Sequence, residues 1–209
     1  MLDEEFAGLK ILSYGVTISA DLHCNKELKG DLSDLSGVKI GVSGGMNAGV
    51  VQRLGATPVS LGFFDLFEGL QRGTIDCITQ PYAPFVPAGF AEVTNFHVPL
   101  PLGAASTITF MQQDRFDALP DDAKAAIEAN SGLVLATALE THFGKQDAAG
   151  FALVDGVEGH VFRDLTDEEL AVWYEKGINP TVQEFLDANP GSSEILESYK
   201  EILAAVQAE

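Results

Sequence analysis

The feature that most constrains the fold is a strand, a glycine-rich turn and a helix that follow one another in residues 38–54. Residues 38–42 alternate apolar side chains as a short strand does, and residues 46–54 place apolar side chains at helical spacing. Ser43 and two glycines form the turn that joins them. Gly55 then provides a C-terminal cap for the helix.

The alternation of strand and helix continues over residues 56–79. We predict a strand at residues 56–60, an amphipathic helix at residues 63–71 and another strand at residues 74–79. Strands joined in sequence by helices are typical of a sheet with parallel strands. The sequence therefore predicts the α/β fold class.

The middle of the chain predicts two extended segments, at residues 95–102 and 106–111, and then a long helix. Pro120 stands at the first turn of this helix, where its missing N–H has no cost. Gly132 interrupts the apolar pattern and favours a break there. Residues 150–161 are expected to form a loop and a strand.

Both ends of the chain carry local signals. Near the N-terminus, residues 9–18 are β-prone and predict a strand with a kink or crossover at Gly15. The last third is predicted to be helical, with capping boxes that begin at Thr166 and at Thr181. Trp173 is expected to pack in the interior.

The charge of the chain excludes several classes of partner. Its 31 acidic and 12 basic residues give a net charge of −19, which repels nucleic acid and anionic membrane surfaces. No apolar stretch reaches the ~20 residues of a membrane span, and the acidic start is unlike a signal peptide. Cys24 and Cys77 match no metal-binding spacing and leave open whether they pair. We expect no metal and no cofactor, since no phosphate-loop or dinucleotide motif is present.

Residues 41–45 fit the G-x-S-x-G pattern of a nucleophile elbow, with Ser43 as the nucleophile. A serine hydrolase would also need an acid and a histidine, and Asp117 with His142, or Asp155 with His160, have the required order. No glycine-rich oxyanion motif precedes the serine. Other interpretations are a plain connecting turn, or a turn that offers the free N–H groups of a helix N-terminus to an anion.

Four segments carry a resemblance to a known family. Residues 35–48, 54–59, 70–76 and 116–120 resemble, in this order and spacing, the solute-binding proteins of TRAP-type transporters. The resemblance runs from about Leu9 to Val206 and corresponds to the later two thirds of the family's usual length.

The resemblance implies a periplasmic-binding-protein type II-like α/β fold of two lobes with hinge crossovers, the first lobe being incomplete. By analogy, residues 1–15 are the end of lobe I with the hinge strand. Residues 16–103 and 150–209 form lobe II, and residues 104–149 are a returning segment of lobe I. An incomplete lobe predicts exposed apolar surface and self-association.

The function implied by the resemblance is that of an extracytoplasmic solute receptor, a binding protein and not an enzyme. It would close on a small organic acid or related polar solute in the periplasm and deliver it to the membrane permease subunits of a TRAP transporter. The family usually places arginines where this chain has Gly41 and Ala20. A carboxylate would therefore lack its main counter-charge, and a neutral, amidic or sugar-like solute is the other expectation.

The ligand contacts that we predict come from the glycine turn and from the segments that follow two strands. Backbone and hydroxyl donation is assigned to Ser43, amide hydrogen bonding to Asn47 and Gln80, and aromatic walls to Phe63 and Tyr82. No catalytic residue and no metal ligand is predicted.

Overall fold

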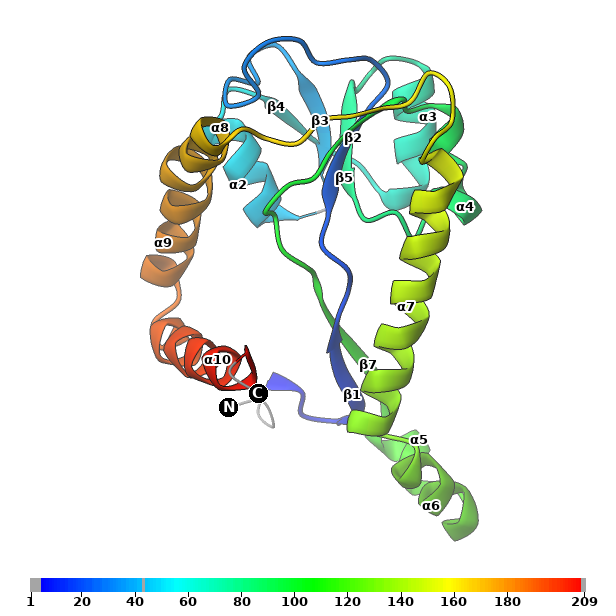
Figure 1. Ribbon diagram of the computed structural model, residues 1–209. Helices are drawn as coiled ribbons and strands as arrows, with labels where there is room; N and C mark the ends of the chain where they lie inside the picture. Colours follow the sequence, from blue (N-terminus) through cyan, green and yellow to red (C-terminus); the bar gives the residue numbers. More distant parts are fainter. Residues whose placement is uncertain (1–4, 43, 208–209) are drawn as a thin grey trace. The chain divides into compact units, whose positions relative to one another are not determined.

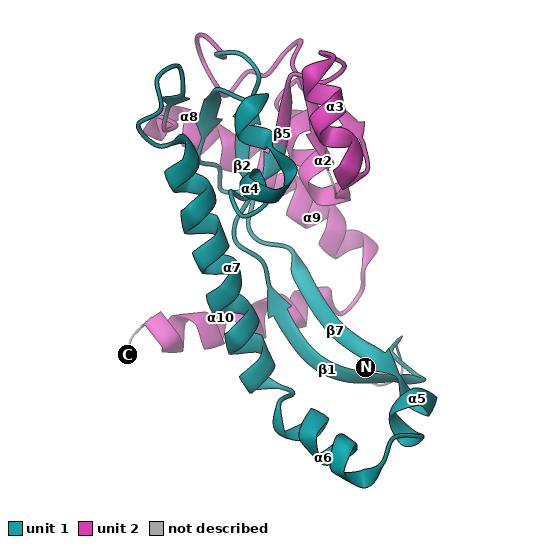
Figure 2. Cartoon of the chain, turned by 90° about the vertical axis from the view of Figure 1, so that its right-hand side faces the viewer, with its two compact units in different colours: residues 1–27, 79–163 teal, residues 28–78, 164–209 magenta. Residues whose placement is uncertain are grey.

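The structure is a computed structural model that describes residues 5–42 and 44–207, and it divides into two compact units (Figure 2). Unit 1 contains residues 1–27 and 79–163, and unit 2 contains residues 28–78 and 164–209. Each unit is thus built from two separate stretches of the chain. The lobe boundaries implied by the resemblance remain a prediction.

Unit 2 contains the predicted parallel strands. The strand β3 (Lys39–Val42) pairs in parallel with β4 (Thr57–Ser60) and with β5 (Cys77–Gln80), whose last two residues belong to unit 1. Ile40 stands opposite Pro58 on one side and Cys77 on the other. The α/β prediction is confirmed. The third strand, β5, begins at Cys77 and ends at Gln80, so it overlaps the predicted residues 74–79 but starts later.

The helices of unit 2 that were predicted after β3 and β4 are both present. They are α2 (Gly45–Arg53) and the short η1 (Phe63–Asp65), which continues as α3 (Leu66–Gln71) (Figure 1). Gly55 follows α2 with a φ of +90°, a left-handed conformation that favours glycine. The side chains that fill the unit's interior are fully buried; among them are Ile40, Val51, Leu66, Ile75 and Ile78.

The second stretch of unit 2 is helical, as predicted. It comprises α8 (Asp167–Val172), the π-helix η3 (Trp173–Ile178), α9 (Asn179–Ala188) and α10 (Ser192–Gln207). The capping box at Thr166 is confirmed, because its hydroxyl accepts from the Glu169 N–H at 3.2 Å while the Glu169 carboxylate accepts from the Thr166 N–H at 2.9 Å.

The second predicted capping box, at Thr181, is wrong. The helical path runs through η3 into α9 before it reaches Thr181, so no helix begins there. The Thr181 hydroxyl instead donates to the Gly177 carbonyl at 2.7 Å, as a threonine does inside a helix.

Leu32 ties the two stretches of unit 2 together. Its carbonyl accepts from the Trp173 indole N–H at 2.9 Å, and its N–H donates to the Glu169 carboxylate at 2.6 Å. Trp173 is fully buried, as predicted, and Glu169 is 6% exposed. A buried carboxylate is tolerated here because both of its oxygens accept N–H groups.

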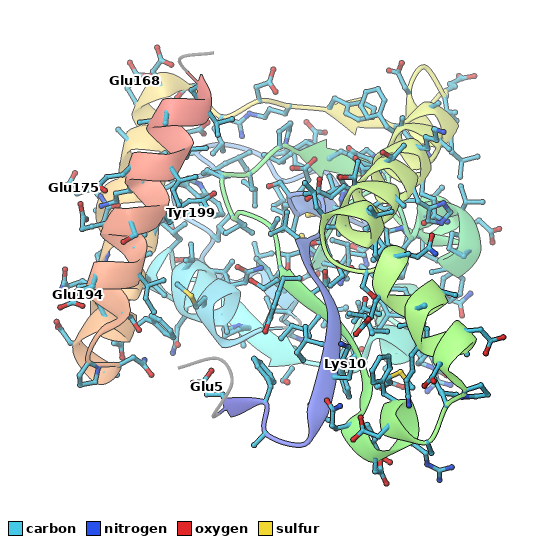
Figure 3. The ribbon with its side chains drawn as sticks, turned by 90° about the horizontal axis from the view of Figure 1, so that it is seen from below. Glu5, Lys10, Glu168, Glu175, Glu194 and Tyr199 are labelled. Carbon is cyan, nitrogen blue, oxygen red and sulfur yellow. The ribbon has the colours of Figure 1, made fainter. Side chains whose placement is uncertain are left out.

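The helix α10 is amphipathic and carries exposed apolar side chains. Glu194 and Tyr199 project to different sides of it, and Glu168 and Glu175 project from the preceding helices (Figure 3). Apolar side chains of α10 that are at least 41% exposed are Ile195, Tyr199, Ile202, Leu203 and Val206. No helix of the part described is long and apolar enough to cross a membrane.

Unit 1 contains a two-stranded antiparallel sheet, formed by β1 (Leu9–Val16) and β7 (Ser106–Gln112). The kink predicted at Gly15 is wrong, because Gly15 keeps its place in the ladder opposite Thr107. The irregularity falls between Ile11 and Ser13 instead.

The predicted long helix of unit 1 is broken at Gly132, and a short helix α5 (Gln113–Asp117) precedes it. The two parts are α6 (Asp121–Ala129) and α7 (Leu133–Val154). Gly132 has a φ of +63°, which ends the helical path. The loop predicted from residue 150 is wrong for residues 150–154, which remain in α7. There the glycine at position 150 serves close packing and does not end the helix.

The remaining strands of unit 1 are β2 (Asp21–Cys24), β6 (Phe96–Val98) and β8 (Val161–Phe162). The strand β6 pairs antiparallel with β2 and parallel with β8. The short helices α4 (Phe85–Ala88) and η2 (Phe90–Glu92) lie between β5 and β6 in sequence and bury Phe85 and Phe90. Both cysteines of the chain are disulfide-bonded.

Candidate functional site

A cavity of about 280 Å³ lies within unit 1. It is formed by the start of the segment after β1, the residues that follow β5, and the middle of α7. Its polar side chains are those of Thr17, Gln80 and Gln146, and its apolar lining residues are Ile18, Pro81, Ala83, Pro84, Pro87 and Phe143. Every lining residue is uncharged.

Gln80 is the predicted site residue that lines this cavity. It ends β5 and is 9% exposed. Three prolines in the next seven positions, Pro81, Pro84 and Pro87, all line the cavity. Proline fixes φ and donates no hydrogen bond, so this wall is stiff and mainly apolar. The proline-rich sequence after the third strand therefore forms a ligand-sized wall at a strand's carboxyl end.

Tyr82 lies behind this wall and is 5% exposed. Its ring packs 4.7 Å from the His23 ring and 5.4 Å edge-on from Phe151, between ring centroids. Burial and the nearby carboxylates of Asp21 and Asp147 raise the pKa of the Tyr82 hydroxyl. In this structure Tyr82 supports the wall from the interior.

The helix α7 holds the wall in place. The Ala83 N–H donates to the Asp147 carboxylate at 3.0 Å, and α7 packs against α4. Gly150 lies directly against the Tyr82 carbonyl, in a space that a side chain would fill. Burial raises the pKa of Asp147, while the N–H groups of Ala83 and Tyr82 lower it.

Three histidines form a hydrogen-bonded chain that ends at Gln80. His23 Nε2 lies 2.8 Å from the Gln80 carbonyl oxygen, and His23 Nδ1 lies 2.9 Å from His97 Nδ1. His97 Nε2 in turn lies 2.9 Å from His160 Nδ1. His23 and His97 are fully buried, and His160 is partly exposed.

The sequence analysis did not predict this cluster. His23 and His97 are 74 positions apart, and His97 and His160 are 63 positions apart, so no local pattern links them. The pairing of β2 with β6, which sets His23 opposite His97, brings the first two together. Burial and the neighbouring ring lower the pKa of His23 to about 3 and that of His97 to about 4. Burial also lowers the pKa of His160.

Asp21 is a further buried titratable group of unit 1. Its carboxylate accepts from the Leu100 N–H at 3.2 Å. Burial raises its pKa to about 6, the Leu100 hydrogen bond opposes the rise, and Asp147 adds to it. No sequence signal marked this residue.

In unit 2, Asn47 lies on the first turn of α2 and is partly exposed, and Phe63 begins η1 with 39% of its surface exposed. The Phe63 ring packs edge-on with that of Phe64, with 5.5 Å between centroids. Gln80 and Tyr82 thus lie together in unit 1, and Asn47 and Phe63 lie in unit 2. Ser43 lies outside the described residues.

A second cavity, of about 790 Å³, lies in unit 2 along α2 and α9. Met46 and Phe185 line it and are 43% and 45% exposed. Its cation, Arg53, is paired with Glu184 at 2.7 Å, so the charge is already compensated. We therefore place the candidate site at the smaller cavity of unit 1, because its lining combines uncharged polar side chains with apolar ones, as a ligand site does.

Gly41, the position at which the resemblance implies an arginine, faces the interior of unit 2. A Cβ at this position would lie 2.8 Å from Ile75 Cδ1 and 2.9 Å from Leu66 Cδ2. Both neighbours are fully buried. Within residues 5–42 and 44–207, no cluster of three or more metal-ligating side chains is arranged to hold a metal ion.

Comparisons with known proteins agree with this architecture. Residues 3–188 match the family described as bacterial extracellular solute-binding protein, family 7. A solute-binding protein of Roseobacter denitrificans is 29% identical over 160 residues, which are 72% of this chain and 49% of the relative. The chain therefore spans about half the length of that curated relative.

Solved structures share the fold. A TRAP solute-binding protein from a marine metagenome, specific for aromatic acid ligands and complexed with 3-hydroxybenzoate, matches with a TM-score of 0.86 and 20% identity over 97% of this chain and 65% of that one. A TRAP periplasmic solute-binding protein of Bordetella bronchiseptica with bound mandelate gives a TM-score of 0.79 and 22% identity over 88% of this chain and 59% of that one. Since the family match extends over most of the sequence, this chain belongs to family 7 of the bacterial extracellular solute-binding proteins.

Proposed function

We propose that this chain is the solute receptor of a TRAP-type transporter, which captures a small organic solute in the periplasm and delivers it to the membrane permease. It acts by binding and performs no chemistry on the solute. The family membership and the cavity of unit 1 support this proposal. The proteins of known structure that share its fold include receptors with bound 3-hydroxybenzoate and mandelate.

The single observation that carries the proposal is the lining of the unit 1 cavity. Thr17, Gln80 and Gln146 supply hydrogen-bond donors and acceptors, and Phe143 with the prolines supplies apolar contact. Because its lining residues carry no charge, the cavity suits an aromatic or apolar solute with a carbonyl, amide or hydroxyl group. A free carboxylate would gain less here than beside an arginine.

The other predicted contacts stay part of the proposal. We assign Asn47 to amide hydrogen bonding, Phe63 and Tyr82 to aromatic walls, and Ser43 to backbone and hydroxyl donation. Tyr82 would act through the wall that it supports, since its side chain is buried against His23 and Phe151.

Calorimetry with the full chain tests the proposal. We expect 3-hydroxybenzoate, mandelate or benzamide to bind, with benzamide at least as tight as benzoate because the cavity lining is uncharged. Gln80→Ala and Gln146→Ala should each weaken binding about tenfold, the effect of one lost hydrogen bond of about 1.4 kcal/mol. Gln183→Ala on the exposed face of α9 is the matched control and should change nothing. Binding that is indifferent to both cavity variants would place the solute elsewhere.

A fluorophosphonate probe tests whether the chain works as a serine hydrolase. We expect no labelling of Ser43, since a binding protein needs no activated nucleophile. Stoichiometric labelling that disappears in Ser43→Ala would overturn the proposal.

Self-association through unit 1 is the last part of the proposal. Tyr14, Val16 and Phe110 on the two-stranded sheet are 45%, 49% and 54% exposed, which supports it. Light scattering over a range of concentrations should show a mass above 22.2 kDa. A monomer mass at every concentration would contradict self-association, and the proposal of solute binding would still stand.

A further inference from the structure

The histidine chain of unit 1 has a direction that its chemistry fixes. A carbonyl oxygen only accepts hydrogen bonds, so the hydrogen between His23 and Gln80 must be carried by His23 Nε2. A neutral imidazole carries one hydrogen, which leaves His23 Nδ1 as an acceptor. One backbone carbonyl thus sets the tautomer of a buried ring.

The same reasoning extends to the other two rings. His97 Nδ1 must donate to His23 Nδ1, so the neutral His97 ring accepts at Nε2. His160 Nδ1 must then donate to His97 Nε2. All three tautomers are therefore determined, and two of the rings carry their hydrogen on Nδ1.

The histidine chain can bind one additional proton without losing a hydrogen bond. A proton bound at His160 Nε2 leaves every hydrogen bond in place, because His160 still donates from Nδ1. If the two bridging hydrogens each shift toward His23, the charge moves to His23. The two hydrogen bonds between rings then reverse direction without breaking, and His23 Nε2 still donates to the Gln80 carbonyl. A second proton sets two N–H groups against each other across a 2.9 Å separation, and one link must open.

The surroundings offer the rings little compensation for charge. Tyr82, Phe85 and Phe162 pack around them, with ring centroids 4.6–4.9 Å from His23 or His97. The causes of the lowered pKa values of His23 and His97 are burial and the adjacent ring. The charged groups on the surrounding elements are Asp21 of β2, Glu92 of η2, Glu140, Lys145 and Asp147 of α7, Asp155 and Glu158 of the turn after α7, and Arg163 after β8.

We propose that His23, His97 and His160 are positioning residues of the Gln80 cavity. Because their hydrogen-bonded chain holds only one additional proton, we propose that acid breaks it and loosens the cavity wall at Gln80. While all hydrogen bonds of the histidine chain are made, this histidine chain fixes the Gln80 carbonyl at the end of β5 and holds the turn before β8 on β6. When the second proton opens a link, the Gln80 wall loses this anchor. The effect on solute capture rests on the proposed function, whereas the protonation of the histidine chain does not.

The ring nitrogens of the full chain, labelled with ¹⁵N in histidine and free of ligand, test this directly. At pH 8 we expect His23 as the Nε2–H tautomer, and His97 and His160 as the Nδ1–H tautomer that free histidine disfavours. On acidification His160 should titrate first, with the Gln80 backbone amide signal unchanged. That signal should move only in the second, more acidic step. Nε2–H tautomers at His97 and His160, or a Gln80 signal that moves with the first step, would overturn the proposal.

The variant His97→Gln distinguishes protonation of the histidine chain from other effects of acid on the protein. Glutamine at position 97 can donate and accept but binds no proton, so His97→Gln should remove the acid step of the Gln80 signal. His142→Gln, exposed on α7, is the matched control and should keep both steps. A folded His97→Gln protein with an unchanged acid step contradicts the proposal. The titration of the unsubstituted chain decides it if this variant does not fold.

Benzamide, which does not titrate in this range, serves as the solute probe. Below the second step its affinity should fall about tenfold per pH unit, the linkage of one proton. If benzamide binds with a pH-independent affinity while Gln80 shows its acid step, the chain does not position the cavity. If no solute binds at any pH, the proposed function fails, and the nitrogen titration still tests the histidine chain.

Discussion

Gly150 of α7 lies directly against the backbone carbonyl of Tyr82, with no room for a side chain between them. This contact sets how closely α7 approaches the segment that forms the cavity wall. The obstacle is backbone, which cannot rotate away as a side chain would.

Gly150→Ala should therefore destabilise unit 1, because the new methyl group must push α7 and the Tyr82 segment apart. We expect a loss of about 1–3 kcal/mol in the free energy of unfolding, as for other overpacked sites. Urea unfolding followed by circular dichroism measures it. Gly144→Ala on the same helix meets nothing within 4 Å and should be neutral or stabilising by up to about 1 kcal/mol.

Glu169 should contribute far more to the stability of unit 2 than its exposed neighbour Glu168. Glu169→Ala leaves the N–H groups of Leu32 and Thr166 without their acceptor, at a cost of about 1–3 kcal/mol. Glu168→Ala, on the same helical turn, should stay within about 0.5 kcal/mol of the unsubstituted chain. Equal losses in thermal unfolding would show that the buried hydrogen bonds do not matter.

His23 and His97 should make the protein less stable in acid. The unfolded chain binds protons at these rings near the ordinary pKa of 6.5, whereas the folded chain does so only near pH 3 and pH 4. The stability of their neutral state is therefore fully present above about pH 6.5 and is lost as the pH falls toward 4. Each ring contributes a slope of up to about 1.4 kcal/mol per pH unit. Urea titrations at a series of pH values should show a smaller slope for His97→Gln.

Asp21 acts in the opposite direction. Its pKa of about 6 in the folded chain lies above the ordinary 3.8, so its ionised form costs stability above pH 6. Asp21→Asn keeps an oxygen for the Leu100 N–H and should raise the melting temperature at pH 7.5. The gain should shrink as the pH falls from 6 toward 3.8 and vanish below 3.8, where the Asp21 carboxyl is protonated in the folded and the unfolded chain alike. A gain of the same size at about pH 3 would contradict this account.

Reduction should lower the stability of the chain, because both cysteines are disulfide-bonded and fully buried. We expect a loss of about 2–4 kcal/mol, the usual contribution of such a crosslink. Unfolding in urea with and without dithiothreitol measures it. The double variant Cys24→Ser, Cys77→Ser is the control and should be indifferent to the reductant.

Local signals in the sequence predicted local structure well. The strand and the helix within residues 38–54 follow from apolar spacing, and the capping box at Thr166 follows from two side chains three positions apart. The capping box predicted at Thr181 is wrong because the residues before it are already helical, which the four-residue motif alone cannot show. The glycine at position 150 looked like a helix end because its packing partner, Tyr82, is distant in sequence.

The candidate site was predictable only in part. Gln80 could be found because it follows a strand and precedes prolines. Gln146 and Phe143 come from a helix more than sixty positions later, whose approach depends on tertiary packing. The histidine chain depends on strand pairing between distant segments, and hydrophobic periodicity carries no information about which strands pair.

The packing around Gly41 also bears on how this chain could acquire a cation at that position in evolution. Leu66 and Ile75 fill the volume that any larger residue at position 41 would enter. A single substitution to a cationic residue at position 41 would therefore disrupt folding before the new charge could contact a ligand. Smaller residues at positions 66 and 75 would have to come first, so the order of substitutions, and not only their number, restricts how a cation can arise here.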